Sequence, residues 1–92
     1  MTKQDFVNKF YPAAKAAGAE FNINPVVVLA QAAIESGWGE SKLSSYNNFF
    51  GITAYGRINN YWHGGKIQLA DNGLPFRRYD TMENSFMDYC RL

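Results

Sequence analysis

The segment from Asn24 to Gly39 constrains the fold of this chain more than any other stretch. Asn24 followed by Pro25 is a strong helix start, because asparagine caps a first turn and proline fits its first position. The sequence VVVLAQAAIES then favours a helix that continues until Gly37 and Gly39 end it. Its apolar residues fall on nearly every face, so we predict that this helix is buried in the middle of the domain.

A second helix is predicted before this segment. Thr2 and Asp5 resemble a capping box, and apolar residues then recur at helical spacing up to Gly18. Pro12 falls inside that pattern. The helix should therefore kink or restart there, because proline lacks a backbone N–H and clashes with the preceding turn.

The second half of the chain predicts less regular structure. Residues 41–65 are rich in Ser, Asn, Gly and aromatic side chains, which indicates loops and short turns. The stretches KIQL and PFRRY flank ADNGL, in which Asn72 and Gly73 are the preferred pair for a tight hairpin turn. Thr81 then caps a last helix. The predicted fold is therefore mainly α, an α+β domain with one β-hairpin.

Length, charge and cysteine content limit the classes of function. The 92 residues suffice for one small domain, and a formal charge of +1 indicates neither nucleic acid nor an anionic membrane as a partner. Cys90 is the only cysteine, and His63 has no nearby cysteine or acidic companions that would complete a metal site. We expect a monomer without metal or cofactor, with no membrane insertion and no export signal within these residues.

Glu35 is the strongest candidate for chemistry. Gln31 and Glu35 are four apart, so both project from one face of an otherwise apolar helix, and we expect that face to line a cleft. The negative end of the helix dipole and partial burial beside Trp38 would both favour the protonated carboxyl group. Cleavage of a glycosidic bond requires such an acid, since the leaving oxygen must receive a proton.

The alternative is that Glu35 is a solvated residue at a helix end that pairs with Lys42 or Arg57, as charged residues commonly do. The surrounding string favours the catalytic interpretation. The stretch AQAAIESGWGESKLSSYNNFFGI, residues 30–52, resembles the signature of the bacterial endo-β-N-acetylglucosaminidase family, the peptidoglycan glucosaminidase domain of autolysins and the flagellar muramidase. FRRYDT at 76–81 and SFMDY at 85–89 continue the resemblance through nearly the whole chain.

The resemblance implies a lysozyme-like domain over residues 1–92 that hydrolyses β-1,4 bonds at N-acetylglucosamine in peptidoglycan. Its place of action would be the cell wall, the periplasm or the cell exterior, and Glu35 would be the general acid. A glycosidase usually needs a second carboxylate, and an acidic residue on the family's hairpin points to Asp71. A plain turn role for Asp71 is the alternative, and the substrate's N-acetyl group can replace a second carboxylate in some families.

Further polar and aromatic residues are candidates for glycan binding. They are Gln31, Trp38, Tyr46, Asn47, Asn48 and Tyr61. A structural role is open for several of them. Trp38 can equally pack in the core, and the side chains of loop asparagines often hydrogen-bond the backbone of their own turn. We interpret the remaining candidates as structural residues, rim residues or, for the cysteine, a buried thiol: Arg77, Arg78, Asp80 and Cys90.

Family domains usually continue beyond the Asp88-Tyr89 pair into further helical segments, so the resemblance indicates that this C-terminal part is lacking here. Two other functions therefore stay open. A lytic transglycosylase also uses one glutamate at a helix end but needs no water. A glycan-binding or structural module would keep the cleft without turnover.

Overall fold

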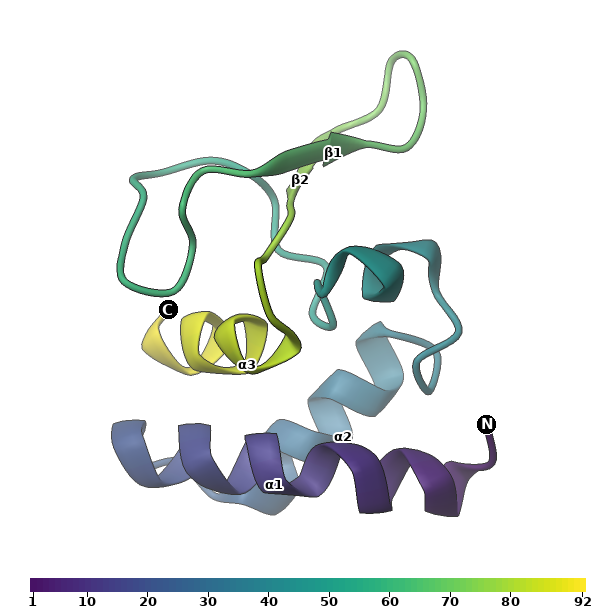
Figure 1. Ribbon diagram of the computed structural model, residues 1–92, viewed down its shortest axis with the longest axis vertical. Helices are drawn as coiled ribbons and strands as arrows, with labels where there is room; N and C mark the ends of the chain where they lie inside the picture. Colours follow the sequence, from purple (N-terminus) through teal and green to yellow (C-terminus); the bar gives the residue numbers. More distant parts are fainter.

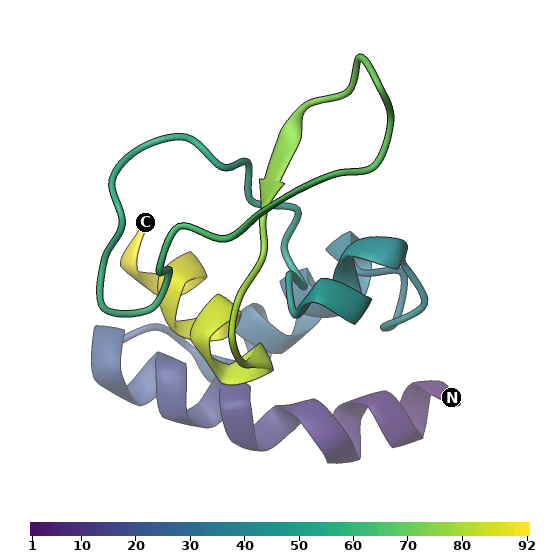
Figure 2. The same ribbon diagram turned by 45° about the horizontal axis from the view of Figure 1, so that its top comes forward.

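The computed structural model describes residues 1–92 as three α-helices, a short 3-10 helix and a two-stranded antiparallel sheet (Figure 1). In chain order the elements are α1 (Lys3–Phe21), α2 (Pro25–Glu35), η1 (Lys42–Tyr46), β1 (Lys66–Gln68), β2 (Pro75–Arg77) and α3 (Met82–Arg91). The α-helices pack together on one side, and the sheet lies on the opposite side (Figures 1 and 2). The predicted mainly α fold with one hairpin is confirmed. No helix combines the length and the apolar character needed to span a membrane.

The start of α1 has the predicted capping box. The hydroxyl of Thr2 accepts the Asp5 N–H at 3.0 Å, and the Asp5 carboxylate accepts the Thr2 N–H at 3.2 Å. The predicted restart at Pro12 is wrong, because α1 runs unbroken through it. Pro12 and Asn8 are both exposed, so water can bind the Asn8 carbonyl that the proline leaves without a donor.

The end of α1 lies beyond Gly18, where the apolar pattern predicted it. The helix continues to Phe21, and Asn22 closes it in the left-handed conformation at φ 57°. Gly18 marks a close approach, since a Cβ atom there would lie 2.4 Å from the carbonyl oxygen of Ile23. The glycine therefore lets the turn between α1 and α2 fold back onto the first helix.

Helix α2 begins as predicted but is not buried on every face. The side chain of Asn24 accepts the Val26 N–H at 2.9 Å, and Pro25 occupies the first turn. One side of the helix packs against α1 and α3, while Val26, Val27 and Ile34 remain 62%, 56% and 71% exposed. The prediction of a central helix is wrong because no other element covers the opposite side.

A left-handed turn follows α2. Gly37, Trp38 and Gly39 have φ angles of 56°, 57° and 81°. Such angles suit glycine and are unusual for a residue as bulky as tryptophan. The buried hydroxyl of Ser36 accepts the Gly39 N–H at 2.9 Å, and the Trp38 N–H binds the Ala33 carbonyl at 2.8 Å. These contacts hold the chain reversal against the end of the helix.

Aromatic side chains fill the space between the helices. Phe86 of α3 is fully buried, with its ring 6.3 Å from that of Phe10, 5.9 Å from Phe49 and 5.0 Å from Phe50. Phe6 extends this cluster along α1, 4.7 Å from Phe10. A smaller buried cluster is separate from this core and consists of Ala54, Trp62 and Tyr79.

The hairpin differs from its prediction in the turn. The strand register ends with Gln68 opposite Pro75, so six residues connect the strands. Gly73 closes a turn whose two central residues are Asp71 and Asn72. The expected two-residue turn at Asn72 and Gly73 is therefore wrong. The Gln68 amide holds the longer connection, donating to the carbonyls of Asp71 at 3.2 Å and Gly73 at 2.7 Å.

Helix α3 begins at the predicted cap. The hydroxyl of Thr81 accepts the Asn84 N–H at 3.1 Å. Phe86 and Cys90 are buried on the inner face of the helix, and burial raises the pKa of the Cys90 thiol. The interpretation of Cys90 as a buried thiol is confirmed.

Candidate active site

Glu35 is the last residue of α2, and its carboxylate is exposed. Gln31, one turn earlier, donates from Nε2 to Glu35 Oε1 at 2.9 Å, so the two side chains share a face as their spacing predicts. No ion pair joins Glu35 to Lys42 or Arg57. The ion pair that the structural alternative expected is therefore absent, while the exposed position of Glu35 at the helix end agrees with the rest of that alternative.

The second carboxylate oxygen of Glu35 faces Gly51. A Cβ atom built on Gly51 would lie 3.9 Å from Glu35 Oε2, and Gly51 has a φ of 64°. A larger residue would be strained in this conformation and would direct its side chain at the acid. The glycine therefore leaves one side of the carboxylate open.

An apolar pocket of about 480 Å³ begins at Gly51. It extends between the first half of α2 and the end of α3, and the parallel rings of Phe50 and Tyr89, 4.1 Å apart, form part of its wall. Its other lining residues are Ile23, Val27, Val28, Ile52, Thr53, Cys90 and Leu92. Gly51 contributes to this wall and also faces Glu35, whereas Gln31 and Glu35, which were expected to line a cleft, do not themselves line this pocket.

Trp38 lies on the other side of the helix end. Its indole packs edge-on against Phe6, with ring centroids 5.5 Å apart, and Lys3 Nζ lies 5.0 Å from the indole centroid. The left-handed turn directs the ring toward α1, so the expected burial of Glu35 beside Trp38 is wrong. This placement favours the alternative that Trp38 packs in the core.

Asn47 and Asn48 hold backbone segments together. Asn47 ends η1 in the left-handed conformation, and its amide donates to the Tyr79 carbonyl at 2.9 Å. Asn48 is 1% exposed; its amide donates to the carbonyls of Ile52 and Arg77 at 3.0 and 2.9 Å. Both asparagines thus have the structural role in a loop that was the alternative to glycan binding.

Tyr61 and Asp71 lie away from the end of α2. The ring of Tyr61 contacts Phe21 with centroids 6.0 Å apart, whereas Trp38 contacts Phe6 at the other end of α1. Phe6 and Phe21 are fifteen positions apart, which corresponds to about 22 Å of helix. Asp71 is exposed in the hairpin turn, whose tip points away from the three helices (Figures 1 and 2). Tyr46 is half-buried at the end of η1.

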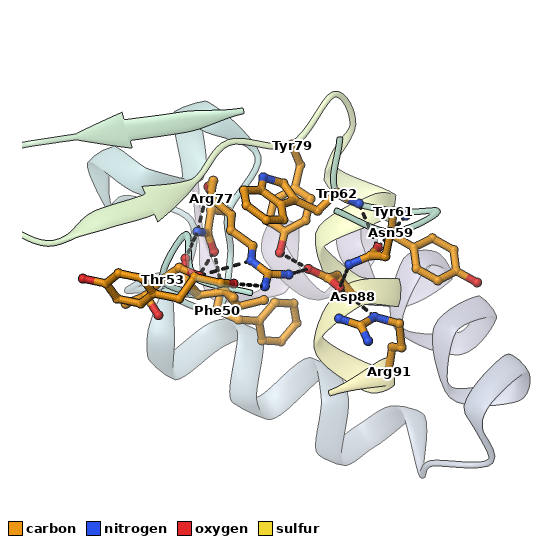
Figure 3. A network of polar contacts seen from close by, with 12 residues as sticks. Phe50, Thr53, Asn59, Tyr61, Trp62, Arg77, Tyr79, Asp88 and Arg91 are labelled. Carbon is orange, nitrogen blue, oxygen red and sulfur yellow. Dashed lines mark hydrogen bonds and ion pairs between the residues drawn. The ribbon is translucent and has the colours of Figure 1, made fainter. Parts of the chain in front are cut away.

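A buried ion pair joins the sheet to α3 (Figure 3). Arg77 Nη1 lies 2.6 Å from Asp88 Oδ2, and the Tyr79 hydroxyl donates to the same oxygen. Burial alone would raise the pKa of Asp88, but hydrogen bonds from Tyr79, Arg77 and Arg91 outweigh it and lower the pKa below its usual value. Burial and the Asp88 carboxylate raise the pKa of Tyr79.

Sequence reasoning assigned no role to Asp88 and left Arg77 as a structural or rim residue. The alternation of side chains along the predicted second strand could have indicated this pair. Arg77 and Tyr79 are two residues apart, so both side chains point to the same side of the strand. A buried tyrosine on that side implies an inward arginine, which needs a carboxylate partner.

His63 has an acidic neighbour, contrary to the sequence analysis. Its Nδ1 lies 2.6 Å from Asp80 Oδ2 and its Nε2 lies 3.2 Å from the Asn60 carbonyl oxygen. Both partners are acceptors, so both contacts require a doubly protonated imidazole. The hydrogen bond to Asp80, followed by that to Asn60, raises the pKa of His63 above 6.5.

The charge of His63 is therefore expected to depend on pH. With a folded pKa above the unfolded one, its contribution to stability is complete below the unfolded pKa and is lost as pH rises through the folded value. We expect an NMR titration of the imidazole to give a midpoint above 6.5, and Asp80→Asn to lower that midpoint. An identical midpoint in the variant would contradict the assignment.

Residues 11–92 match the sequence profile of the glucosaminidase family, described as mannosyl-glycoprotein endo-beta-N-acetylglucosaminidase. This chain belongs to the glucosaminidase family. The match includes the Glu35 region, the hairpin and α3, so the resemblance seen in the sequence is confirmed. Membership also places the exposed glutamate of α2 within a family of glycan-cleaving domains.

Relatives of this glucosaminidase domain are longer proteins. The peptidoglycan hydrolase FlgJ of Vibrio parahaemolyticus is 34% identical over 96% of this chain, which spans 32% of that protein. The probable N-acetylmuramidase of Lactococcus lactis subsp. cremoris is 34% identical over 95% of the chain, which spans 21% of it. This chain thus corresponds to about a third or less of these curated relatives.

The glucosaminidase fold has a solved counterpart. The glycoside hydrolase domain of Salmonella typhimurium FlgJ superposes with a TM-score of 0.80 and 25% identity, covering 99% of this chain and 60% of that one. The predicted lysozyme-like fold is confirmed by this similarity.

Proposed function

We propose that this chain cleaves glycosidic bonds of bacterial peptidoglycan, with Glu35 as the general acid. One observation carries the proposal: the Glu35 carboxylate is exposed at the end of α2, oriented by Gln31 at 2.9 Å and free of any cation. An exposed carboxyl group is accessible to the leaving oxygen of a glycan that binds at this helix end. Family membership supports the choice of substrate.

The proposed bond is the β-1,4 linkage at N-acetylglucosamine, which agrees with the description of the family. Relatives include a peptidoglycan hydrolase and a probable N-acetylmuramidase, so the names of the relatives do not all specify the same glycosidic bond. Two alternatives stay open: a lytic transglycosylase, which needs no water, and a glycan-binding module without turnover. The place of action would be the cell wall, the periplasm or the cell exterior.

The identity of the second group that assists Glu35 in catalysis is proposed separately. Asp71 is the hairpin carboxylate, and its position in an exposed turn means that the hairpin tip must approach the bound glycan for Asp71 to take part. If Asp71 stays at a distance, the N-acetyl group of the substrate can supply the second function. We keep Asp71 as the candidate, with this substrate-assisted route as its rival.

Glycan contacts are proposed around the acid. Gln31 is the nearest candidate because it already binds Glu35, and the half-buried Tyr46 ends the neighbouring 3-10 helix. The other predicted contact residues would bind glycan only through the parts of their side chains that their structural contacts leave free. These are Trp38, Asn47 and Tyr61, whereas the donors and the acceptor of the buried Asn48 amide are already bonded within the chain.

Mass spectrometry of the fragments released from purified peptidoglycan tests the proposal. We expect fragments with N-acetylglucosamine at the reducing end. N-acetylmuramic acid at that end would indicate a muramidase, and an anhydro sugar would indicate a transglycosylase. Glycan binding without any released fragment would overturn the enzymatic proposal in favour of a binding module. An Asp71→Asn variant digested in parallel should release fewer fragments if Asp71 assists.

A further inference from the structure

Asp88 is a buried carboxylate that binds four side chains. It is 0% exposed, and it accepts Arg77 Nη1 at 2.6 Å, Arg91 Nε at 3.0 Å, Asn59 Nδ2 at 3.1 Å and the Tyr79 hydroxyl (Figure 3). A charge in a protein interior is tolerated only when it is paired and hydrogen-bonded. Asp88 is therefore the centre of a cluster whose parts come from α3, the second strand and the loop before the sheet.

Arg77 connects this carboxylate to the backbone of the neighbouring loop. Its Nε donates to the Thr53 carbonyl at 3.1 Å, its Nη2 donates to the Tyr55 carbonyl, and its own N–H donates to the Ile52 carbonyl at 2.9 Å. The guanidinium also lies over the Trp62 ring, 4.2 Å from its centroid. One buried side chain thus binds the backbone at Thr53 and Tyr55, and the backbone of the same arginine binds Ile52.

Asn48 joins the backbone of the same arginine to the residues on either side of Gly51. Its amide nitrogen donates to the Arg77 carbonyl at 2.9 Å, and its amide oxygen accepts two backbone N–H groups of the loop at 3.3 and 3.2 Å. These bonds close the loop around Gly51, the residue that faces Glu35 Oε2. Hydrogen bonds therefore run from α3 through Arg77 and Asn48 to the residues on either side of Gly51, which faces the candidate acid.

We propose that Asp88 is a positioning residue, which fixes the Gly51 side of the Glu35 carboxylate by way of Arg77. The inference rests on the proposed function, since the position of Glu35 matters for turnover only if Glu35 is the acid. Stability alone is a weak reason for such a cluster, because apolar residues often replace a buried ion pair without loss. The rigid fork of the guanidinium binds several acceptors in defined directions, which apolar residues cannot do.

The test separates positioning from stability. A triple variant, Arg77→Met with Tyr79→Phe and Asp88→Leu, replaces the three buried polar side chains at the centre of the cluster with apolar ones of similar volume. Asp88→Asn removes the charge and replaces one of the two accepting oxygens with an NH2 donor. Arg91→Met is the matched control, because it removes the half-exposed cation on the same carboxylate and has no contact with residues 48–55. Each variant of the full chain is measured for thermal unfolding, kcat and KM on peptidoglycan, and the NMR shifts of the Gly51 and Ile52 amides.

We expect the triple variant and Asp88→Asn to shift the Gly51 and Ile52 amides and to lower kcat more than they raise KM. Misplacement of a catalytic group can reduce kcat by about 10²-fold. Arg91→Met should leave both properties unchanged. If the triple variant does not fold, Asp88→Asn provides the same comparison below its unfolding temperature. A folded variant with wild-type amide shifts and wild-type kcat overturns the inference. An inactive wild-type chain instead overturns the proposed function, while the amide shifts still decide whether Asp88 positions Gly51.

Discussion

The Glu35→Gln variant is expected to lose about 10²–10⁴-fold in kcat on peptidoglycan, the usual contribution of proton transfer by a positioned acid. Glutamine keeps the size of the side chain and can still accept the hydrogen bond from Gln31, but it cannot protonate a leaving oxygen. The position is exposed, so the free energy of unfolding should change by no more than about 0.5 kcal/mol.

Release of fragments from purified cell walls, measured beside thermal unfolding, checks this prediction. Glu20→Gln is the matched control, because Glu20 is also an exposed glutamate in the last turn of a helix. It lies on α1, does not line the pocket, and should keep wild-type activity. A fully active Glu35→Gln variant would refute the role of Glu35. Equal losses in both variants would instead indicate an effect of net charge.

The Phe86→Ala variant should lose about 3–5 kcal/mol in free energy of unfolding, as expected for removal of a fully buried phenylalanine. Its ring contacts those of Phe10, Phe49 and Phe50, so the cavity would open between α1, α3 and the loop before the pocket. Small domains have total stabilities of about 5–15 kcal/mol. A substantial fraction of the variant should therefore be unfolded at elevated temperature.

Chemical denaturation monitored by circular dichroism measures this loss. Ile58→Ala is the control, since Ile58 is 68% exposed and its truncation should cost about 0.5 kcal/mol or less. Phe86→Leu should fall between the two variants, because leucine leaves a smaller cavity. A loss below about 1 kcal/mol in Phe86→Ala would mean that the aromatic core repacks around the gap.

Helix starts were predictable because their chemistry is local. Thr2, Asn24 and Thr81 each bind a backbone N–H two or three residues further on, so the signal lies within a few positions. The position of Glu35 relative to Gln31 was predictable for the same reason. Contacts of this length depend on helix geometry and on no other part of the chain.

Other features depend on which elements meet in space. The burial of α2 was predicted wrongly because an apolar pattern indicates what a helix can bury, not whether another element covers each face. The hairpin turn was predicted wrongly because strand pairing, not the Asn72-Gly73 sequence, sets the length of the connection. Within the candidate site, the approach of Gly51 to Glu35 joins residues sixteen apart and has no local signal.

The reversal at Gly37, Trp38 and Gly39 separates a tryptophan from an acid only three residues before it. Were the helix to continue, the indole would lie on the next turn, three positions along, and would cover the carboxylate. A side chain at either glycine would cost about 1–3 kcal/mol in this conformation. The end of α2 therefore carries two separate requirements within five residues: the glycines permit the reversal of the chain, and the reversal keeps the carboxylate of Glu35 exposed to solvent.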